Sequence, residues 1–211
     1  MLFALRALRP VMALVDEHPP PPDSFQGGLP IADIEHGTTW WRIHKTPNAP
    51  VFFGPTSGDP PTYRFDAPGG EYRILYVGLT LSAAYVETLL RNPRIPYVER
   101  TEIETRSASV LTNDHTLKLV DLRGAGLSRI GADNRLITGS YEIAGQWAVA
   151  LWRHRDHPDG ILYRSKYDPN HICSAIFDRP HCQFSVSSTK LLMDIPHQWA
   201  PILNVHRKGI A

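Results

Sequence analysis

Four polar side chains interrupt otherwise apolar segments of this chain and are the first candidates for chemistry. They are a guanidinium, a phenol, a carboxylate and a hydroxyl, carried by Arg42, Tyr76, Glu87 and Ser165. A guanidinium binds phosphate or carboxylate through two parallel hydrogen bonds, and a carboxylate stabilises positive charge that develops beside it. A phenol ring stacks on flat ligands, and a hydroxyl donates or accepts a hydrogen bond. Each residue also fits an ordinary role, as an ion-pair residue, a core tyrosine, a solvated glutamate or a turn serine.

Metal ligands form a second, weaker pattern. Two histidines and two cysteines fall within twelve residues, at His171, Cys173, His181 and Cys182. Thiolate and imidazole are the usual zinc ligands, but this spacing does not match the common zinc motifs. We therefore expect no metal site. Two cysteines also cannot form a disulfide framework, which favours a reducing compartment.

The composition excludes several classes of function. The 211 residues include 22 basic and 21 acidic side chains, for a formal net charge of +1, and this balance argues against direct binding of nucleic acid. No apolar run approaches the roughly 20 residues that span a bilayer, and arginines interrupt the apolar N-terminus, so we expect a cytoplasmic protein. The sequence also lacks the nucleophile-elbow, zinc-protease, P-loop and Rossmann motifs.

The elements that must position the candidates are strands and helices in irregular order. Alternating aromatic and β-branched residues predict strands, and Thr80 and Ser140 are suitable N-caps for two helices. We expect strands near 40–44, 72–79, 118–120, 161–165, 172–178, 185–188 and 202–205, and helices over 81–91 and after residue 140. Because strands and helices do not alternate regularly, the pattern favours an α+β fold over a doubly wound parallel sheet.

The N-terminus differs from the rest of the chain. Apolar residues at helical spacing predict an amphipathic helix over 2–15, and four prolines follow at 19–22. We interpret residues 1–30 as an arm with a proline linker, packed on its own body or on a partner, and residues 31–211 as the body. Self-association of the chain into a homodimer through this arm stays open.

The order of the motifs resembles the RES domain family. WWRIH is followed by YRFDAPGGEYRILYVG, by a helix that contains YVE, and by GILYRS with CSAIFD, so the resemblance covers about residues 38–180 of the body. It implies an ADP-ribosyltransferase-like mixed β core with flanking helices. It further implies a toxin of a toxin–antitoxin pair that consumes NAD⁺ without a metal, and a partner antitoxin with an Xre-like helix-turn-helix segment.

Carried over by motif, the resemblance assigns roles to individual residues. Glu87 would stabilise the ribosyl cation that forms when nicotinamide leaves, and Arg42, with Arg64 as a helper, would hold the diphosphate. Tyr76 would stack on the nicotinamide ring, and Ser165 would contact the ribose or the amide.

Two further positions qualify this assignment. His44 shares a strand face with Arg42 and would orient a ribose or a water molecule, although a packed core histidine is the more ordinary explanation. The turn after Arg64 reads Arg-Phe-Asp66, where the family usually has asparagine as the third residue.

We therefore expect an enzyme that cleaves the nicotinamide–ribose bond of NAD⁺, of the glycohydrolase or phosphorylase type. Two alternatives remain at this point: a mono-ADP-ribosyltransferase that modifies a specific cellular protein, and a non-catalytic NAD-binding module. The sequence does not identify what captures the ribosyl cation, whether water, phosphate or a protein.

Overall fold

The fold is an eight-stranded mixed sheet flanked by helices, as the computed structural model describes it for residues 18–22, 25–56 and 58–211. The expected α+β class is confirmed. The strands are β1 (Ile31–Ile34), β2 (Thr39–Lys45), β3 (Ile74–Gly78), β4 (Tyr97–Val98), β5 (Arg106–Asn113), β6 (Leu117–Asp121), β7 (Gly160–Arg164), β8 (Ile172–Phe177), β9 (Phe184–Leu191) and β10 (Gly209–Ile210). The helices are α1 (Leu81–Leu89), α2 (Arg100–Glu104), α3 (Gly126–Arg129), α4 (Arg135–Thr138), α5 (Tyr141–Trp152) and α6 (Pro196–Val205), with a 3₁₀ turn at Leu192–Asp194.

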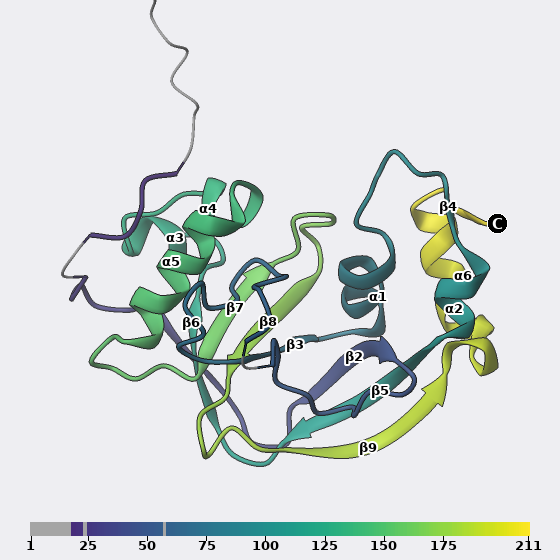
Figure 1. The fold of residues 1–211 in the computed structure, drawn as a ribbon, viewed down its shortest axis with the longest axis horizontal. Helices are drawn as coiled ribbons and strands as arrows, with labels where there is room; N and C mark the ends of the chain where they lie inside the picture. The colour runs from purple at the N-terminus through teal and green to yellow at the C-terminus, as the bar shows by residue number, and fades with distance from the viewer. Residues whose placement is uncertain (1–17, 23–24, 57) are drawn as a thin grey trace, which may run out of the picture.

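The main sheet has the strand order β1-β6-β7-β8-β3-β2-β5-β9, and all its pairs are antiparallel except β6 with β7. A separate short pair joins β4 and β10. The helices form two groups: α3, α4 and α5 lie beside β6 and β7, whereas α1, α2 and α6 lie at the end where β2 and β5 are found (Figure 1). A cavity lies between these two groups, lined by residues of α1 on one side and of α4 and α5 on the other.

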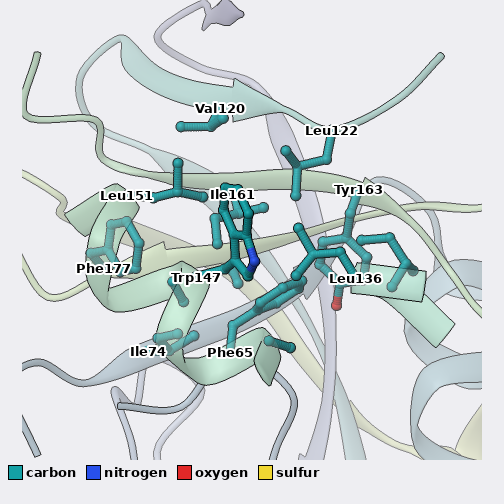
Figure 2. Packing of buried hydrophobic residues seen from close by; sticks show 14 of the residues in the cluster. Phe65, Ile74, Val120, Leu122, Leu136, Trp147, Leu151, Ile161, Tyr163 and Phe177 are labelled. Carbon is teal, nitrogen blue, oxygen red and sulfur yellow. The ribbon is translucent and has the colours of Figure 1, made fainter. Parts of the chain in front are cut away.

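Local sequence signals account for the two long helices nearest the cavity. The Thr80 hydroxyl accepts a hydrogen bond from the Ala83 amide at 3.0 Å and begins α1, as its side-chain chemistry predicts. Ser140 caps α5 in the same way, through the Glu142 amide at 3.2 Å. The apolar stripe of α5 is buried, and Figure 2 shows its Trp147 packed close to Phe65.

The C-terminal prediction was wrong in one place. Residues 202–205 were expected to form a strand, but they end helix α6. Pro196 occupies the first turn of this helix, where proline is well tolerated, and Trp199, Ile202 and Leu203 form a buried face at helical spacing. Tertiary packing of that face therefore overrides the β-branched character of the segment.

The described part of the arm packs on α5. The Trp147 indole donates a hydrogen bond to the carbonyl of Pro19 at 2.9 Å, and Phe25 meets the same indole edge-on at 5.6 Å between ring centroids. The His154 ring bonds the carbonyl of Gly27 at 2.9 Å. The helix expected over 2–15 lies outside the described residues. Among the helices that the structure describes, none is long and apolar enough to cross a membrane.

Strands β2 and β3 are neighbours in the sheet but pair at a single position, Trp41 with Gly78. The two strands part beyond that pair. At the same point, Gly78 allows α1 to approach the end of β3, because a Cβ on Gly78 would lie 2.7 Å from the Cβ of Ala83 and 2.8 Å from the amide nitrogen of Ala84. The parting of the strands and the close approach of α1 together shape the cavity.

Candidate active site

A cavity of about 700 Å³ opens where β2 and β3 part, which is within the usual size range for cofactor sites. Its walls come from β2, β3 and α1, from the loop around Tyr63, from α4 and α5, and from the turn between β7 and β8. Six cationic side chains and two carboxylates line it: Arg42, Lys45, Arg64, Arg91, Arg106, Lys166, Asp59 and Glu87. The excess of positive charge suits a ligand that carries phosphate groups.

Glu87 lies on α1 and lines this cavity. The solvated glutamate that its sequence position also allowed is not what the structure shows, because α1 is buried on most sides and Glu87 is partly buried with it. Within the part of the chain that the structure describes, its Oε1 atom is buried and has no hydrogen-bond partner. A buried carboxylate oxygen without a donor is costly, so this atom is suited to interact with a ligand.

Arg64 faces the same cavity with a similar deficit. One terminal nitrogen, Nη1, donates to the carbonyl of Gly139 at 2.9 Å, and the guanidinium lies 4.5 Å from the centre of the Tyr141 ring. The other terminal nitrogen, Nη2, is buried and has no hydrogen-bond partner among the described residues. Burial lowers the pKa of Arg64, while the charge of Glu87 is among the groups that oppose this shift. The described residues therefore leave one donor of Arg64 without an acceptor.

Arg42 lines the cavity from β2 and also holds the loop that follows. Its Nη1 donates to the carbonyl of Pro50 at 2.5 Å and to that of Ala49 at 3.3 Å. Burial lowers the pKa of Arg42 to about 10, so the side chain stays cationic at neutral pH. The structure thus adds a loop-anchoring role to the anion-binding role expected from the sequence.

Tyr76 is fixed by its hydroxyl, which donates to Asp66 Oδ1 at 2.9 Å and accepts from the Phe65 amide at 3.0 Å. The other carboxylate oxygen of Asp66 accepts the amides of Thr62 and Tyr63, both at 2.8 Å. Burial and the nearby Asp66 charge raise the pKa of Tyr76 well above its ordinary value, so the phenol is neutral. The departure from the family pattern at Asp66 therefore builds the turn and orients the phenol ring.

Ser165 is not among the residues that line the cavity. It is buried, and its hydroxyl accepts the amides of Tyr167 at 3.1 Å and Asp168 at 3.3 Å. The structure therefore places Ser165 in the turn after β7, almost fully buried and outside the residues that line the cavity. Two cavity residues, Lys166 and Tyr167, lie on this turn, which the Ser165 hydroxyl holds by its hydrogen bonds.

His44 is buried at the wall of the cavity, and its ring is already hydrogen-bonded at both nitrogens. Nε2 lies 2.9 Å from the Ser109 hydroxyl and Nδ1 lies 3.0 Å from the carbonyl of Lys45. Burial lowers the pKa of His44 below its ordinary value, which keeps the ring neutral. These contacts fit the packed histidine that was the alternative to a role in orienting water.

A family model described as the RES domain matches residues 39–200, which is most of the chain. The chain belongs to the RES domain family. A probable toxin from Sinorhizobium fredii is 33% identical over 104 residues, which cover 49% of this chain and 81% of that protein. The crystal structure of the MbcT–MbcA toxin–antitoxin complex of Mycobacterium tuberculosis contains a chain with a similar fold, at a TM-score of 0.59 and 14% identity, covering 80% of this chain and 92% of that one. The expected ADP-ribosyltransferase-like mixed β core is thereby confirmed.

Several residues of this RES domain cavity were not identified from the sequence. Arg91 donates to the carbonyl of Glu87 at 2.6 Å, and its guanidinium lies 4.7 Å from the centre of the Tyr63 ring. Lys166 lies 5.4 Å from the centre of the Tyr141 ring. These side chains come from a helix end and from loops, where no periodic pattern marks them, and only the tertiary fold brings them to one place.

The two histidines and two cysteines that were considered as zinc ligands in the sequence do not form one cluster among the described residues. Cys173 lines the RES domain cavity, where burial raises its pKa, so it is a protonated thiol and a poor nucleophile at neutral pH. His181 and Cys182 lie beside Asp159, and His171 lies elsewhere, beside Asp168 and His206.

Proposed function

We propose that this chain is an enzymatic toxin of a toxin–antitoxin pair, which binds NAD⁺ in the 700 Å³ cavity and breaks the bond between nicotinamide and its ribose. In that reaction the electron pair of the C–N bond goes to the nicotinamide nitrogen. Nicotinamide leaves as a neutral molecule, and the ribose becomes a cation that an acceptor then captures. The leaving group already carries a positive charge, so the reaction needs no general acid.

One observation carries the proposal: two residues of opposite charge that line one cavity each have a buried side-chain atom without a hydrogen-bond partner among the described residues. These atoms are Oε1 of Glu87 and Nη2 of Arg64. A ligand with one cationic and one anionic part would satisfy both atoms. NAD⁺ is such a ligand, since it has a cationic nicotinamide ring and an anionic diphosphate.

The proposed roles follow from these positions. Glu87 stabilises the positive charge that develops on the ribose, and hydrogen-bonds a ribose hydroxyl in the bound state. The free nitrogen of Arg64 binds the diphosphate, and Arg42 contributes charge from the other wall. The neutral phenol of Tyr76, oriented by Asp66, packs against the nicotinamide ring.

Release of nicotinamide tests this function. Purified protein is incubated with NAD⁺, and nicotinamide and ribosyl products are separated by chromatography, with and without added phosphate. We expect nicotinamide to appear at a rate proportional to the protein concentration. Binding of NAD⁺ without release of nicotinamide would instead support a non-catalytic NAD-binding module and overturn the proposal.

The acceptor is proposed to be a small molecule. A second cavity of about 380 Å³ shares Arg42, Tyr63 and Tyr76 with the first, and it gives water or phosphate a place next to the proposed NAD⁺ site. Incubation of labelled NAD⁺ with cell lysate distinguishes the remaining alternative. A discrete labelled protein band would show a mono-ADP-ribosyltransferase and contradict this choice of acceptor, whereas only small labelled products agree with it.

A partner antitoxin is proposed to neutralise the chain by covering the cavity. The support is the similar fold of a chain in the MbcT–MbcA toxin–antitoxin complex and the similarity to a probable toxin from Sinorhizobium fredii. Expression of this chain alone should arrest growth, and co-expression of an adjacent reading frame, expected to be Xre-like, should restore it. Growth unaffected by the chain at verified expression would refute the toxin proposal.

A further inference from the structure

Three side chains of types that ligate metals lie close together, outside the residues that line the cavity. Asp168 and His171 belong to the turn between β7 and β8, and His206 is the residue that ends α6. One ligand atom of each lies within 4.8 Å of the other two. These segments are far apart in the chain, so the grouping is a product of the fold.

The distances within this cluster are unlike those of hydrogen bonds. Nε2 of His171 lies 3.5 Å from Asp168 Oδ2, and Nε2 of His206 lies 3.6 Å from the same oxygen. Hydrogen bonds between nitrogen and oxygen are about 2.7 to 3.2 Å long. Adjacent ligands around tetrahedral zinc are about 3.3 Å apart, given zinc–ligand bonds of about 2.0 to 2.1 Å. Two of the three distances between ligand atoms are therefore close to the spacing in a zinc site, and the third, between the two histidines, is at most 4.8 Å.

Local hydrogen bonds hold two of the three residues in place. The His171 amide donates to the carbonyl of Asp168 at 3.0 Å, and the Ser165 hydroxyl accepts the Asp168 amide at 3.3 Å. Oδ1 of Asp168 accepts the Asn170 amide at 3.0 Å, which leaves Oδ2 directed at both histidines. Outer contacts of this kind orient the ligands of metal sites.

The third residue is fixed by the end of its helix. The His206 amide donates to the carbonyl of Ile202 at 3.2 Å, and the following residue, Arg207, has a φ of 51° that stops the helix. The side chains of Asp168, His171 and His206 are 15%, 21% and 20% exposed, so an ion can reach them and keep a water molecule as its fourth ligand.

The other cluster of three ligands has different contacts. There, His181 Nε2 lies 2.7 Å from Asp159 Oδ1, and Asp159 Oδ2 accepts the Lys118 amide at 2.8 Å. Burial raises the pKa of Cys182 to about 12, so its sulfur is a protonated thiol. That cluster is satisfied by its own hydrogen bonds, and it serves as a control for the first.

We propose that Asp168, His171 and His206 bind one divalent transition metal ion, zinc in the first place, and that this ion ties α6 to the turn between β7 and β8. Imidazole nitrogens and one carboxylate are a donor set that zinc accepts readily. Tyr167, which precedes Asp168, lines the cavity, so the ion would fix one wall of the cavity without touching the ligand.

Metal titration of the purified, metal-free and tag-free protein tests the proposal. Calorimetry with Zn²⁺ should show one site per chain, and Co²⁺ should give the visible absorption of a tetrahedral complex. His206→Gln and His171→Gln should weaken zinc binding by more than the roughly 10- to 100-fold loss seen when an outer contact of a metal site is removed. Glutamine keeps a polar side chain at each position, and circular dichroism verifies the fold.

Two matched controls make the result decisive. His197→Gln alters an exposed histidine of the same helix, and His181→Gln alters the second cluster. Both should bind zinc as the native chain does. The proposal fails if the native chain shows no saturable binding, if His206→Gln binds equally well, or if only His181→Gln loses the ion. None of these readouts uses NAD⁺, so they are independent of the proposed enzyme activity.

Discussion

Replacement of Glu87 by glutamine separates a catalytic role from a structural one, because the two roles predict opposite effects. Glutamine keeps the size of the side chain and removes its charge. The Oε1 atom of Glu87 is buried without a hydrogen-bond partner among the described residues, so the native carboxylate contributes little to folding. We expect the free energy of unfolding of Glu87→Gln to be unchanged or raised by up to about 1 kcal/mol.

The expected loss of activity is much larger. Unit charges about 4 Å apart interact by about 4 kcal/mol at an effective dielectric constant of 20. The ribosyl group carries most of a positive charge in the transition state, so about 3 to 4 kcal/mol of stabilisation would be lost. That corresponds to a fall of about 10²- to 10³-fold in kcat for release of nicotinamide.

The assay compares nicotinamide release with thermal unfolding in the same preparations. Glu104→Gln is the matched control, since this exposed glutamate ends α2 and does not line the cavity. An unchanged kcat for Glu87→Gln would refute the electrostatic role. A large loss of stability would show instead that the carboxylate is structural.

Three further predictions concern the residues around the cavity. Asp66→Ala should lower the free energy of unfolding by several kcal/mol, at about 1 to 3 kcal/mol for each buried group left unpaired. Asp66→Asn should lower it less, by about 1 to 3 kcal/mol, because the amide oxygen still accepts the Thr62 and Tyr63 amides and only the Tyr76 hydroxyl loses its acceptor; urea denaturation measures both variants. Ser165→Ala should lower the free energy of unfolding by about 1 to 3 kcal/mol and also lower kcat. Equal rates of hydrogen exchange at the Tyr167 amide in the native chain and the variant would contradict the role of Ser165 in the turn. Burial lowers the pKa of His44 from 6.5 in the folded protein. The contribution of His44 to the free energy of unfolding is therefore present above pH 6.5 and is lost as the pH falls through the folded pKa. His44→Gln should flatten the acid side of a plot of the free energy of unfolding against pH.

Much of the fold could be predicted from the sequence because local signals agree with the tertiary structure. The alternation around Arg42 predicts β2, and the capping residues Thr80 and Ser140 predict where α1 and α5 begin. The exception is α6, where Pro196 and Pro201 obscure the helical spacing of its buried face. In that segment, packing against α1 decides the structure. Tyr85 of α1 stacks on Trp199 of α6, with 6.2 Å between the two ring centroids.

The candidate site was only partly accessible to such reasoning. Arg42, Tyr76 and Glu87 stand out as polar residues within apolar elements, and the fold brings all three to one cavity. Ser165 shares the same motif signature, but its hydroxyl is occupied by backbone amides. The partners of Asp168 could not be anticipated, since His206 meets it only through the packing of α6 against the rest of the protein.

The single pair between β2 and β3 also affects the energetics of ligand entry. A ligand that enters between two fully paired strands must first break their main-chain hydrogen bonds, and that loss weakens its affinity. Here the two strands are already apart in the folded protein. The missing main-chain hydrogen bonds therefore lower the stability of the protein without ligand and do not weaken its affinity for the ligand. The site is therefore preorganised, with the penalty for opening the sheet already contained in the folded state.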